Sequence, residues 1–169
     1  MKQIKTLLFA AALFIGATSF TNAQTKVAHI DTGVLVESMP EMTSAKTEME
    51  KMGKTYQADI QEMVQEYQTK AKQYEAEAPT KTNEVNQQRG EELAQMQQSI
   101  RQFQADSQRQ IEKKELDLLK PITEKAKAAI LKVGKAQGFN YVLDSSQGSG
   151  VIMAAGKDLL KDVQKELGF

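Results

Sequence analysis

The sequence predicts an α+β fold in which a long antiparallel helical hairpin is inserted in a small β-rich body. Three observations lead to this prediction. Residues 41–120 contain no Cys, no His and one proline, Pro79. The apolar residues of this segment recur at helical spacing on both sides of that proline. Short segments with strand-like alternation lie before and after the hairpin, near the two ends of the chain.

The first 23 residues have the pattern of a secretory signal peptide. Lys2 and Lys5 form a basic start, and the apolar run LLFAAALF at 7–14 is too short to span a bilayer. Small residues precede a predicted cleavage point after Ala23. We therefore expect export across an inner membrane and a mature, periplasmic chain of residues 24–169. A retained membrane anchor is the alternative, which the length of the apolar run disfavours.

The N-terminal part of the predicted body covers residues 24–40. Within it, residues 26–31 (KVAHID) alternate apolar and polar side chains, which is typical of a short strand. Thr32 is expected to cap a short helix, because a threonine hydroxyl can accept from the free N–H groups of a first helical turn. Pro40 is expected to end this helix, since its ring cannot continue one.

The C-terminal part of the predicted body covers residues 121–169. Residues 139–144 (FNYVLD) and 151–155 (VIMAA) are predicted as the two strands of a hairpin, because glycine-rich turn sequence separates them. Residues 157–167 are predicted as an amphipathic closing helix. The N-terminal strand must meet this hairpin to be stable, and three strands leave open edges. Pairing across a symmetric oligomer would cover these edges.

The inserted hairpin, residues 41–120, is called the arm. Apolar and aromatic residues of its outbound half recur at a mean spacing of about 3.6, as on a straight helix. The turn is predicted at 78–80 (APT), with Thr80 or Thr82 capping the return helix. Near its base the return helix is apolar on more than one face, which predicts burial on more than one side. Pro121 is expected to mark a kink or a new first turn there.

The residue types disfavour an enzyme, a metal site and a cofactor. His29 is the single histidine, and the chain has no cysteine. A general base or a metal ligand is one interpretation of His29. We favour a structural strand residue, because no second His or Cys completes a nucleophile pair or a zinc set. Without the predicted signal peptide the chain has 20 basic and 22 acidic residues, which disfavours a nucleic-acid partner.

Taken in order, these elements resemble the Skp/OmpH family of periplasmic chaperones of outer-membrane proteins. The resemblance covers the whole mature chain as a single domain and rests on KVAHID with VLVESMP after it, the Gln/Lys/Glu-rich hairpin, FNYVLDSS, VIMAA and DLLKDVQKEL. It implies a jellyfish-shaped homotrimer, in which a β-rich trimerisation body holds three hairpin tentacles around a cavity. The implied function is ATP-independent binding of unfolded outer-membrane proteins, which prevents their aggregation. A coiled-coil tether or scaffold of the cell envelope is the alternative.

A stripe of methionine and aromatic residues on the arm is the candidate client-binding face. These residues form the seam between the two helices, or face a shared cavity, or do both in part. Flexible methionine and amphipathic tyrosine suit a surface that must accept many partners. The candidates are Met49, Met52, Tyr56, Met63, Tyr67, Tyr74, Met96 and Phe103.

The charge of the arm departs from the basic tentacles of the relatives that the chain resembles. Residues 41–120 contain 12 basic and 15 acidic side chains. Lys81 and Arg89, near the tip, are the candidates for a lipopolysaccharide or peripheral membrane contact. Solvated surface charge is the alternative interpretation of these two residues.

Overall fold

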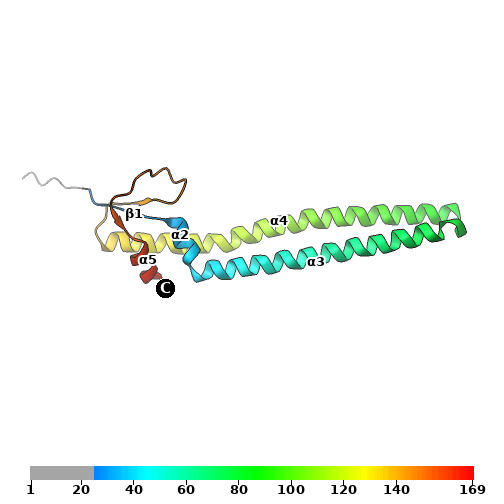
Figure 1. Cartoon of the computed structure of the whole chain (residues 1–169), viewed down its shortest axis with the longest axis horizontal. Coiled ribbons are helices and arrows are strands. Elements are labelled where there is room, and N and C mark those ends of the chain that lie inside the picture. Colours follow the sequence, from blue (N-terminus) through cyan, green and yellow to red (C-terminus); the bar gives the residue numbers. More distant parts are fainter. Residues whose placement is uncertain (1–24) are drawn as a thin grey trace, which may run out of the picture.

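The computed structural model describes residues 25–169, so the predicted signal peptide and its cleavage point at Ala23 lie outside the described residues. A long helical hairpin projects from a small body of strands and helices (Figure 1). This confirms the predicted α+β class and the inserted hairpin. The elements are β1 (Val27–Ile30), α2 (Thr32–Ser38), α3 (Pro40–Glu77), the 3-10 turn η1 (Ala78–Thr80), α4 (Asn83–Ala136), β2 (Tyr141–Asp144), β3 (Lys157–Asp158) and α5 (Leu160–Leu167).

The three strands form one sheet in the order β2-β1-β3, and both pairings are parallel. Val27 on β1 pairs with Tyr141 on β2, and Ala28 on β1 pairs with Lys157 on β3. Parallel neighbours cannot be joined by a tight turn and need a crossover connection. The whole hairpin is therefore the crossover between β1 and β2, and the sheet ties the two ends of the chain together, as expected.

The predicted C-terminal β-hairpin is wrong. β2 forms, but residues 151–155 make no strand, and the chain passes to the far edge of β1 to form the two-residue strand β3. The apolar run at 151–155 lies in a connecting loop, where Ile152 is 102% and Met153 is 82% exposed. At Gly156 a Cβ would lie 3.0 Å from the carbonyl oxygen of Val27, so glycine allows the chain to pass close to β1.

Two predicted helix starts are also wrong. Asp31 caps α2, since its carboxylate accepts a 2.9 Å hydrogen bond from a backbone N–H of the first turn. The hydroxyl of Thr32 instead donates to the carboxylate of Asp144 at 2.7 Å, which ties α2 to the end of β2. α5 begins at Leu160 and not at residue 157, because residues 157–158 are taken up by pairing with β1.

The ends of the long helices follow local signals. Thr82 caps α4 as predicted, accepting a hydrogen bond from the N–H of Val85 at 3.3 Å. Gly138 follows the end of α4 with a φ of 74°, which favours glycine. α4 nevertheless continues through Pro121, so the new first turn predicted there is wrong. A proline removes one helical hydrogen bond, and burial of the adjacent Ile122 in the core offsets that cost.

The hydrophobic core lies in the body and in the arm turns next to it. The fully buried large side chains are Ile30, Leu35, Met39, Leu159 and Val163. They come from β1, α2 and α5 and the segments beside them, so the core joins both ends of the chain. The base of α4 supplies the opposite wall with Ile122, Ala126, Ala129 and Val133.

The base of α4 buries only one face within this chain. Leu116 is 70% exposed and Leu131 is 51% exposed, although both belong to the apolar segment of the return helix. The prediction that this segment is buried on several sides is therefore wrong for the single chain. Its neighbours α2, α3, α5 and β2 leave the side of the helix that carries Leu116 and Leu131 open.

Candidate binding surface of the helical arm

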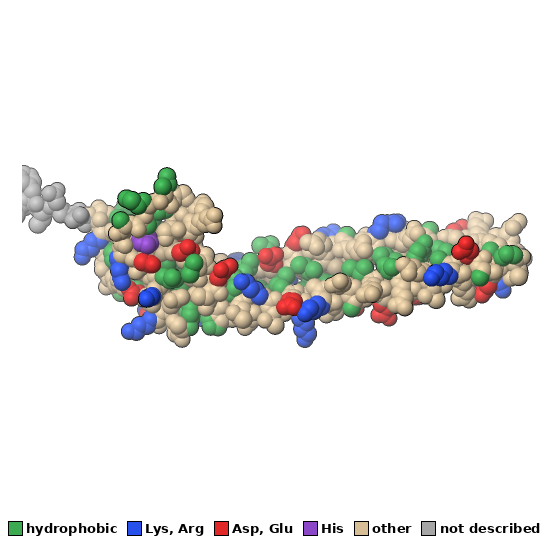
Figure 2. All heavy atoms as spheres, viewed as in Figure 1, with side chains coloured by type: hydrophobic (Ala, Val, Ile, Leu, Met, Phe, Trp, Pro, Cys, Tyr) green, Lys and Arg blue, Asp and Glu red, His purple; other side chains and the backbone are tan. Residues whose placement is uncertain are grey.

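The eight candidate residues of the methionine and aromatic stripe lie half-buried along the seam, the line of contact between α3 and α4. Figure 2 shows hydrophobic side chains as a band along the arm, between charged ones. Tyr56 and Phe103 meet edge to face, with ring centroids 6.0 Å apart and an interplanar angle of 80°. The structure thus brings all eight together as the packing of the hairpin, with part of each side chain at the surface.

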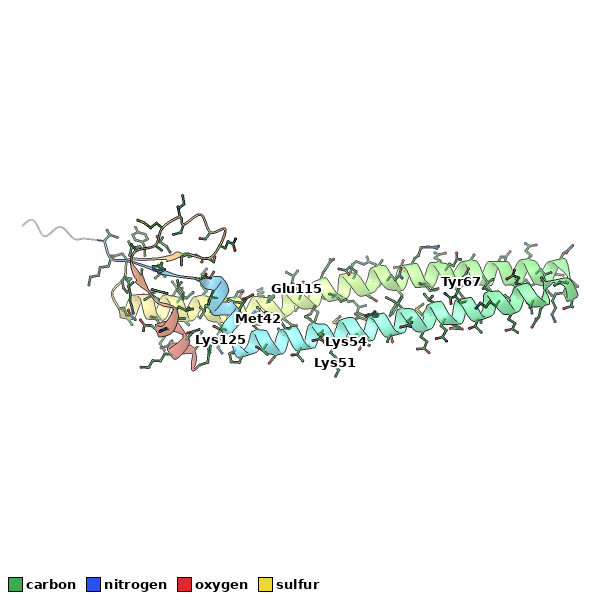
Figure 3. All side chains as sticks on the ribbon, viewed as in Figure 1. Met42, Lys51, Lys54, Tyr67, Glu115 and Lys125 are labelled. Atoms are coloured by element: carbon green, nitrogen blue, oxygen red, sulfur yellow. The ribbon has the colours of Figure 1, made fainter. Side chains whose placement is uncertain are left out.

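Each of three tyrosines on α3 reaches a polar partner on α4. The hydroxyl of Tyr56 donates to Gln110 at 2.7 Å, that of Tyr67 accepts from Gln97, and that of Tyr74 donates to Glu92. Figure 3 labels Tyr67 on the distal half of the arm. A tyrosine ring that packs in the seam while its hydroxyl is partnered at the margin links the helices without a deep core.

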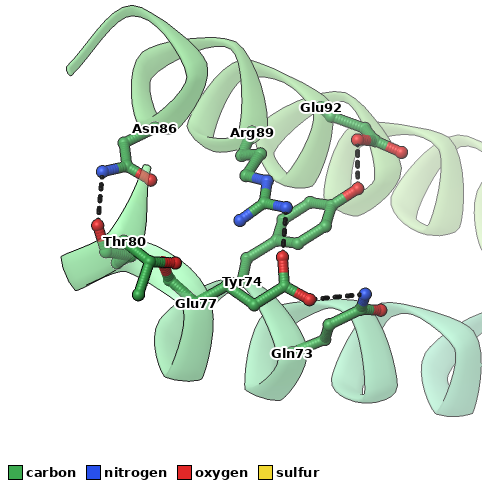
Figure 4. Close-up of polar contacts among 8 residues, drawn as sticks. Gln73, Tyr74, Glu77, Thr80, Asn86, Arg89 and Glu92 are labelled. Atoms are coloured by element: carbon green, nitrogen blue, oxygen red, sulfur yellow. Dashed lines mark hydrogen bonds and ion pairs between the residues drawn. The ribbon is translucent and has the colours of Figure 1, made fainter. Parts of the chain in front are cut away.

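A polar cluster closes the tip of the arm, as Figure 4 shows. Arg89 pairs with the carboxylate of Glu77 at 2.5 Å, and its guanidinium lies 4.4 Å from the centre of the Tyr74 ring. The side-chain amide of Asn86 donates to the carbonyl of Ala78 at 3.0 Å. These contacts join the last turn of α3, η1 and the start of α4.

The ionisable groups of the tip are shifted by these contacts. A hydrogen bond from Lys70, assisted by one from Tyr74, lowers the pKa of Glu92, and the same carboxylate raises the pKa of Lys70 and of Tyr74. Hydrogen bonds from Gln73 and then Arg89 lower the pKa of Glu77. The carboxylates of this cluster therefore have partners within the hairpin, whereas Nη1 of Arg89 is buried and has no hydrogen-bond partner among the described residues.

The two candidates for a lipopolysaccharide contact lie in different settings. Arg89 is half-buried and engaged by Glu77 and Tyr74. Lys81 is exposed at the turn, and no carboxylate of residues 25–169 lies within ion-pair distance of it. Binding of lipopolysaccharide by this pair stays a prediction, with Lys81 as the more accessible charge.

Two adjoining hollows, here called the mid-arm groove, open on the seam halfway along the arm. Their volumes are about 280 and 490 Å³, and they share Met63, Gln95 and Ser99. Gln95 and Ser99 were not among the residues predicted from the sequence. By helical spacing, position 99 belongs to the stripe that contains Met96 and Phe103, and a small serine there leaves space. This interruption of the stripe is the feature of the sequence that could have predicted the groove.

Two further hollows lie at the root of the arm. Their volumes are about 440 and 540 Å³, and both are lined by Ala45 and Leu118. Met42, labelled in Figure 3 near the body, contributes to one of them. The hollows at the root are more apolar than those of the mid-arm groove, and Leu116 is exposed nearby in sequence.

His29 has no catalytic setting in the structure. Its Nδ1 lies 3.2 Å from the hydroxyl oxygen of Ser145, but the adjacent carboxylate of Asp144 faces Thr32 and the N–H of Ser146. Among the described residues, no carboxylate is hydrogen-bonded to this histidine. Among residues 25–169, no group of His, Cys, Asp and Glu could hold a metal ion. None of the helices described is long and apolar enough to cross a membrane.

The arrangement defines a class of protein, a small body that carries a long binding or spacing arm. The comparisons with known proteins identify the family. A family model described as outer membrane protein (OmpH-like) matches residues 26–167, so the chain belongs to the OmpH-like family of outer membrane proteins. This confirms the resemblance seen in the sequence. This family is non-enzymatic, which agrees with the expectation from the residue types.

The fold is shared with a solved structure. A crystal structure of a candidate outer membrane chaperone (OmpH-like) from Caulobacter crescentus is similar to this one, with a TM-score of 0.77. The sequences are 18% identical, and the match covers 86% of this chain and 85% of that chain. At this identity the likeness shows the fold alone. No curated protein matches the chain at a significant level.

Proposed function

We propose that this protein is an ATP-independent periplasmic chaperone that binds unfolded outer-membrane proteins and prevents their aggregation in transit to the outer membrane. Family membership supports the proposal. The observation that carries it is the arm, which projects beyond the core and keeps its methionines and aromatic residues half-exposed along grooves of the seam.

A shallow surface of this kind suits a client that must be held and later released. Flexible methionine side chains adapt to different shapes, so a binding surface of this type is not specific for one sequence. Hydrophobic contact needs no nucleotide, and each half-exposed side chain contributes only part of its full burial energy. Many weak contacts along an arm thus hold an unfolded chain while single contacts exchange.

The test is dilution of a urea-unfolded outer-membrane barrel protein with and without this protein. We expect turbidity to fall as the protein is added in excess, whereas an equal mass of an unrelated soluble protein has no effect. Unchanged turbidity would overturn the proposal. A stable complex with one folded envelope protein and no preference for unfolded chains would instead identify a tether or scaffold.

We also propose a homotrimer that is assembled through the body. Tyr141 and Leu143 on β2, paired in register with Val27 and His29 on β1, line the sheet face that points away from Ala28 and Ile30. Val27, Tyr141 and Leu143 are 40, 61 and 43% exposed, and both outer strands have a free edge. An apolar face and open edges on so small a body favour cover by further copies.

Light scattering tests this assembly. We expect three times the mass of one chain, and a monomer at micromolar concentration would contradict the proposal. Leu143→Asp should dissociate the assembly, while Lys51→Gln on the exposed side of α3 should leave the mass unchanged. Figure 3 labels Lys51 on the arm, away from the body.

The periplasmic location rests on the predicted signal peptide. The N-terminus of the protein secreted by a Gram-negative host would show this directly by mass spectrometry. We expect it to begin at Gln24. Recovery of the uncleaved chain in the membrane fraction would support a retained anchor.

A further inference from the structure

We infer that the mid-arm groove binds extended segments of client in which an apolar side chain lies next to lysine or arginine. The inference rests on the proposed chaperone function, and it adds a location on the arm and a client chemistry. It follows from three features of the groove: its floor, its glutamine wall and its charge.

The floor of the groove is apolar and has room for side chains. Met63, Met96, Ile100 and Phe103 contribute to it, and Ser99 leaves the space above them open. An apolar cavity of about 150 Å³ accommodates benzene, so hollows of about 280 and 490 Å³ can each take a large aliphatic or aromatic side chain. The two thioethers are flexible enough to fit several shapes.

Glutamines on α4 form one wall. Gln95, Gln98 and Gln102 line the groove and follow one side of the helix at i, i+3 and i+7. They cover about 10.5 Å along the helix axis at 1.5 Å per residue, close to the length of three residues of extended chain. A primary amide both donates and accepts hydrogen bonds, so this wall can pair with peptide groups of any sequence.

The charged groups around the groove are mainly acidic. Glu66, Glu92 and Asp106 line it together with a single base, Lys70. The ammonium of Lys70 lies 2.5 Å from Glu92 and 4.0 Å from Glu66, so it compensates only part of this charge. Arg109 pairs with Asp106 from the next turn of α4 and also offsets part of this charge, although it does not line the groove. Three carboxylates against two bases leave a net charge of −1 at the groove.

The carboxylates of Glu92 and Asp106 are ionised at neutral pH. Hydrogen bonds from Gln102 and then Arg109 lower the pKa of Asp106, and Lys70 lowers that of Glu92. The groove therefore repels acidic segments and attracts basic ones. Charge complementarity thus selects, among unfolded segments that offer an apolar side chain, those flanked by lysine or arginine.

The experiment compares two fluorescein-labelled, unstructured peptides with the same apolar centre and either lysine or glutamate flanks. Fluorescence anisotropy with the purified protein should show about threefold tighter binding of the lysine-flanked peptide near 0.1 M salt. The difference should shrink at about 1 M salt, where screening acts within a few ångströms. Equal affinities, or tighter binding of the glutamate-flanked peptide, would overturn the inference.

Matched variants place the effect in the groove. Glu66→Gln with Asp106→Asn should abolish the preference, whereas Glu75→Gln with Glu84→Gln, two exposed carboxylates nearer the tip, should keep it. Ser99→Phe should weaken the binding of both peptides, because the larger side chain fills the groove. Circular dichroism checks that this variant is folded. A preference that survives the first pair and the groove-filling variant would refute this location.

The turbidity assay separates this inference from the proposed function. If the protein suppresses aggregation but shows no preference between the two peptides, the inferred preference for basic segments is refuted and the proposed chaperone function stands. A photo-crosslinker at Met63 should capture the lysine-flanked peptide, and one at Lys51 should not. Capture at both positions alike would contradict a defined groove.

Discussion

The body and the arm are stabilised in different ways. In the body, five large side chains are fully buried between the sheet, α2 and α5. In the arm, which the structure describes in full, no apolar side chain between Ala45 and Ile122 reaches the same burial. Its helices are held by half-buried side chains and by tyrosine, glutamate and arginine contacts that repeat along the seam.

This difference suggests separate roles, in which the body stabilises the fold and the arm is free to bind a partner. A full core contributes most of its free energy at a few positions, so it tolerates little change. A long seam distributes small contributions over many positions, and each leaves apolar surface in contact with water. The arm can therefore offer binding surface along its length, because the body keeps the ends of the chain together.

Shortening one leucine in each region tests the difference in packing between the body and the arm. Leu35→Ala in the body should cost about 3 kcal/mol, since this side chain is fully buried. Leu93→Ala on the arm should cost about 1 kcal/mol, because the leucine is only half-buried. Urea unfolding followed by circular dichroism measures both, and equal losses would show that the seam is as tightly packed as the core.

Gly134→Ala tests how closely α4 lies against the sheet. A Cβ at this position would approach the Cγ2 of Val142 to 2.9 Å, so one side must shift. We expect a loss of about 1–2 kcal/mol in stability, as for other overpacked sites. Val142→Ala in the same chain should restore part of it. A melting temperature unaffected by the single substitution would mean that this contact is loose.

Gly53→Ala makes the same substitution on the arm and should have the opposite sign. Nothing lies within 4 Å of a Cβ at this position, and alanine is the better helix former. A gain of up to about 1 kcal/mol is expected. Thermal unfolding beside Gly134→Ala gives a direct contrast, and a loss at Gly53 would reveal an unexpected packing constraint on α3.

Acidification should affect the tip of the arm, with a smaller effect than any of the substitutions above. The pKa of Glu77 and of Glu92 is lowered in the folded protein, so their contribution is present above the ordinary pKa of glutamate and is lost as the pH falls through the lower, folded value. The melting temperature should therefore fall more steeply below about pH 4 than in Glu92→Gln. If the melting temperatures of the protein and of Glu92→Gln fall in parallel below this pH, the contribution of the Glu92 carboxylate to the tip is contradicted.

The same cluster has an upper limit in pH. The carboxylate of Glu92 raises the pKa of Lys70 and of Tyr74. A group with a raised pKa contributes stability that is present below its ordinary pKa and is lost as the pH rises through its pKa in the folded protein. We therefore expect the tip to be most stable between about pH 4 and 10. Amide exchange of the last turns of α3 would show loss of protection above this range.

The arm could be predicted from the sequence. Helical spacing, Pro79 at the turn and the cap at Thr82 act through residues a few positions apart, so they can be identified without the rest of the fold. The stripe of methionine and aromatic residues was predicted for the same reason. Its interruption at Ser99 was visible in the sequence, although the groove it opens needs the second helix beside it.

The sheet and the exposed surfaces could not be predicted from the sequence, because they depend on contacts between distant segments. Strand order and direction depend on partners more than a hundred residues apart, as between Val27 and Tyr141, and the local turn sequence at 145–150 suggested a hairpin that does not form. Apolar residues such as Leu116 and Ile152 look alike in sequence whether they are buried or exposed. Their exposure follows from which elements pack against them, and that is a property of the whole fold.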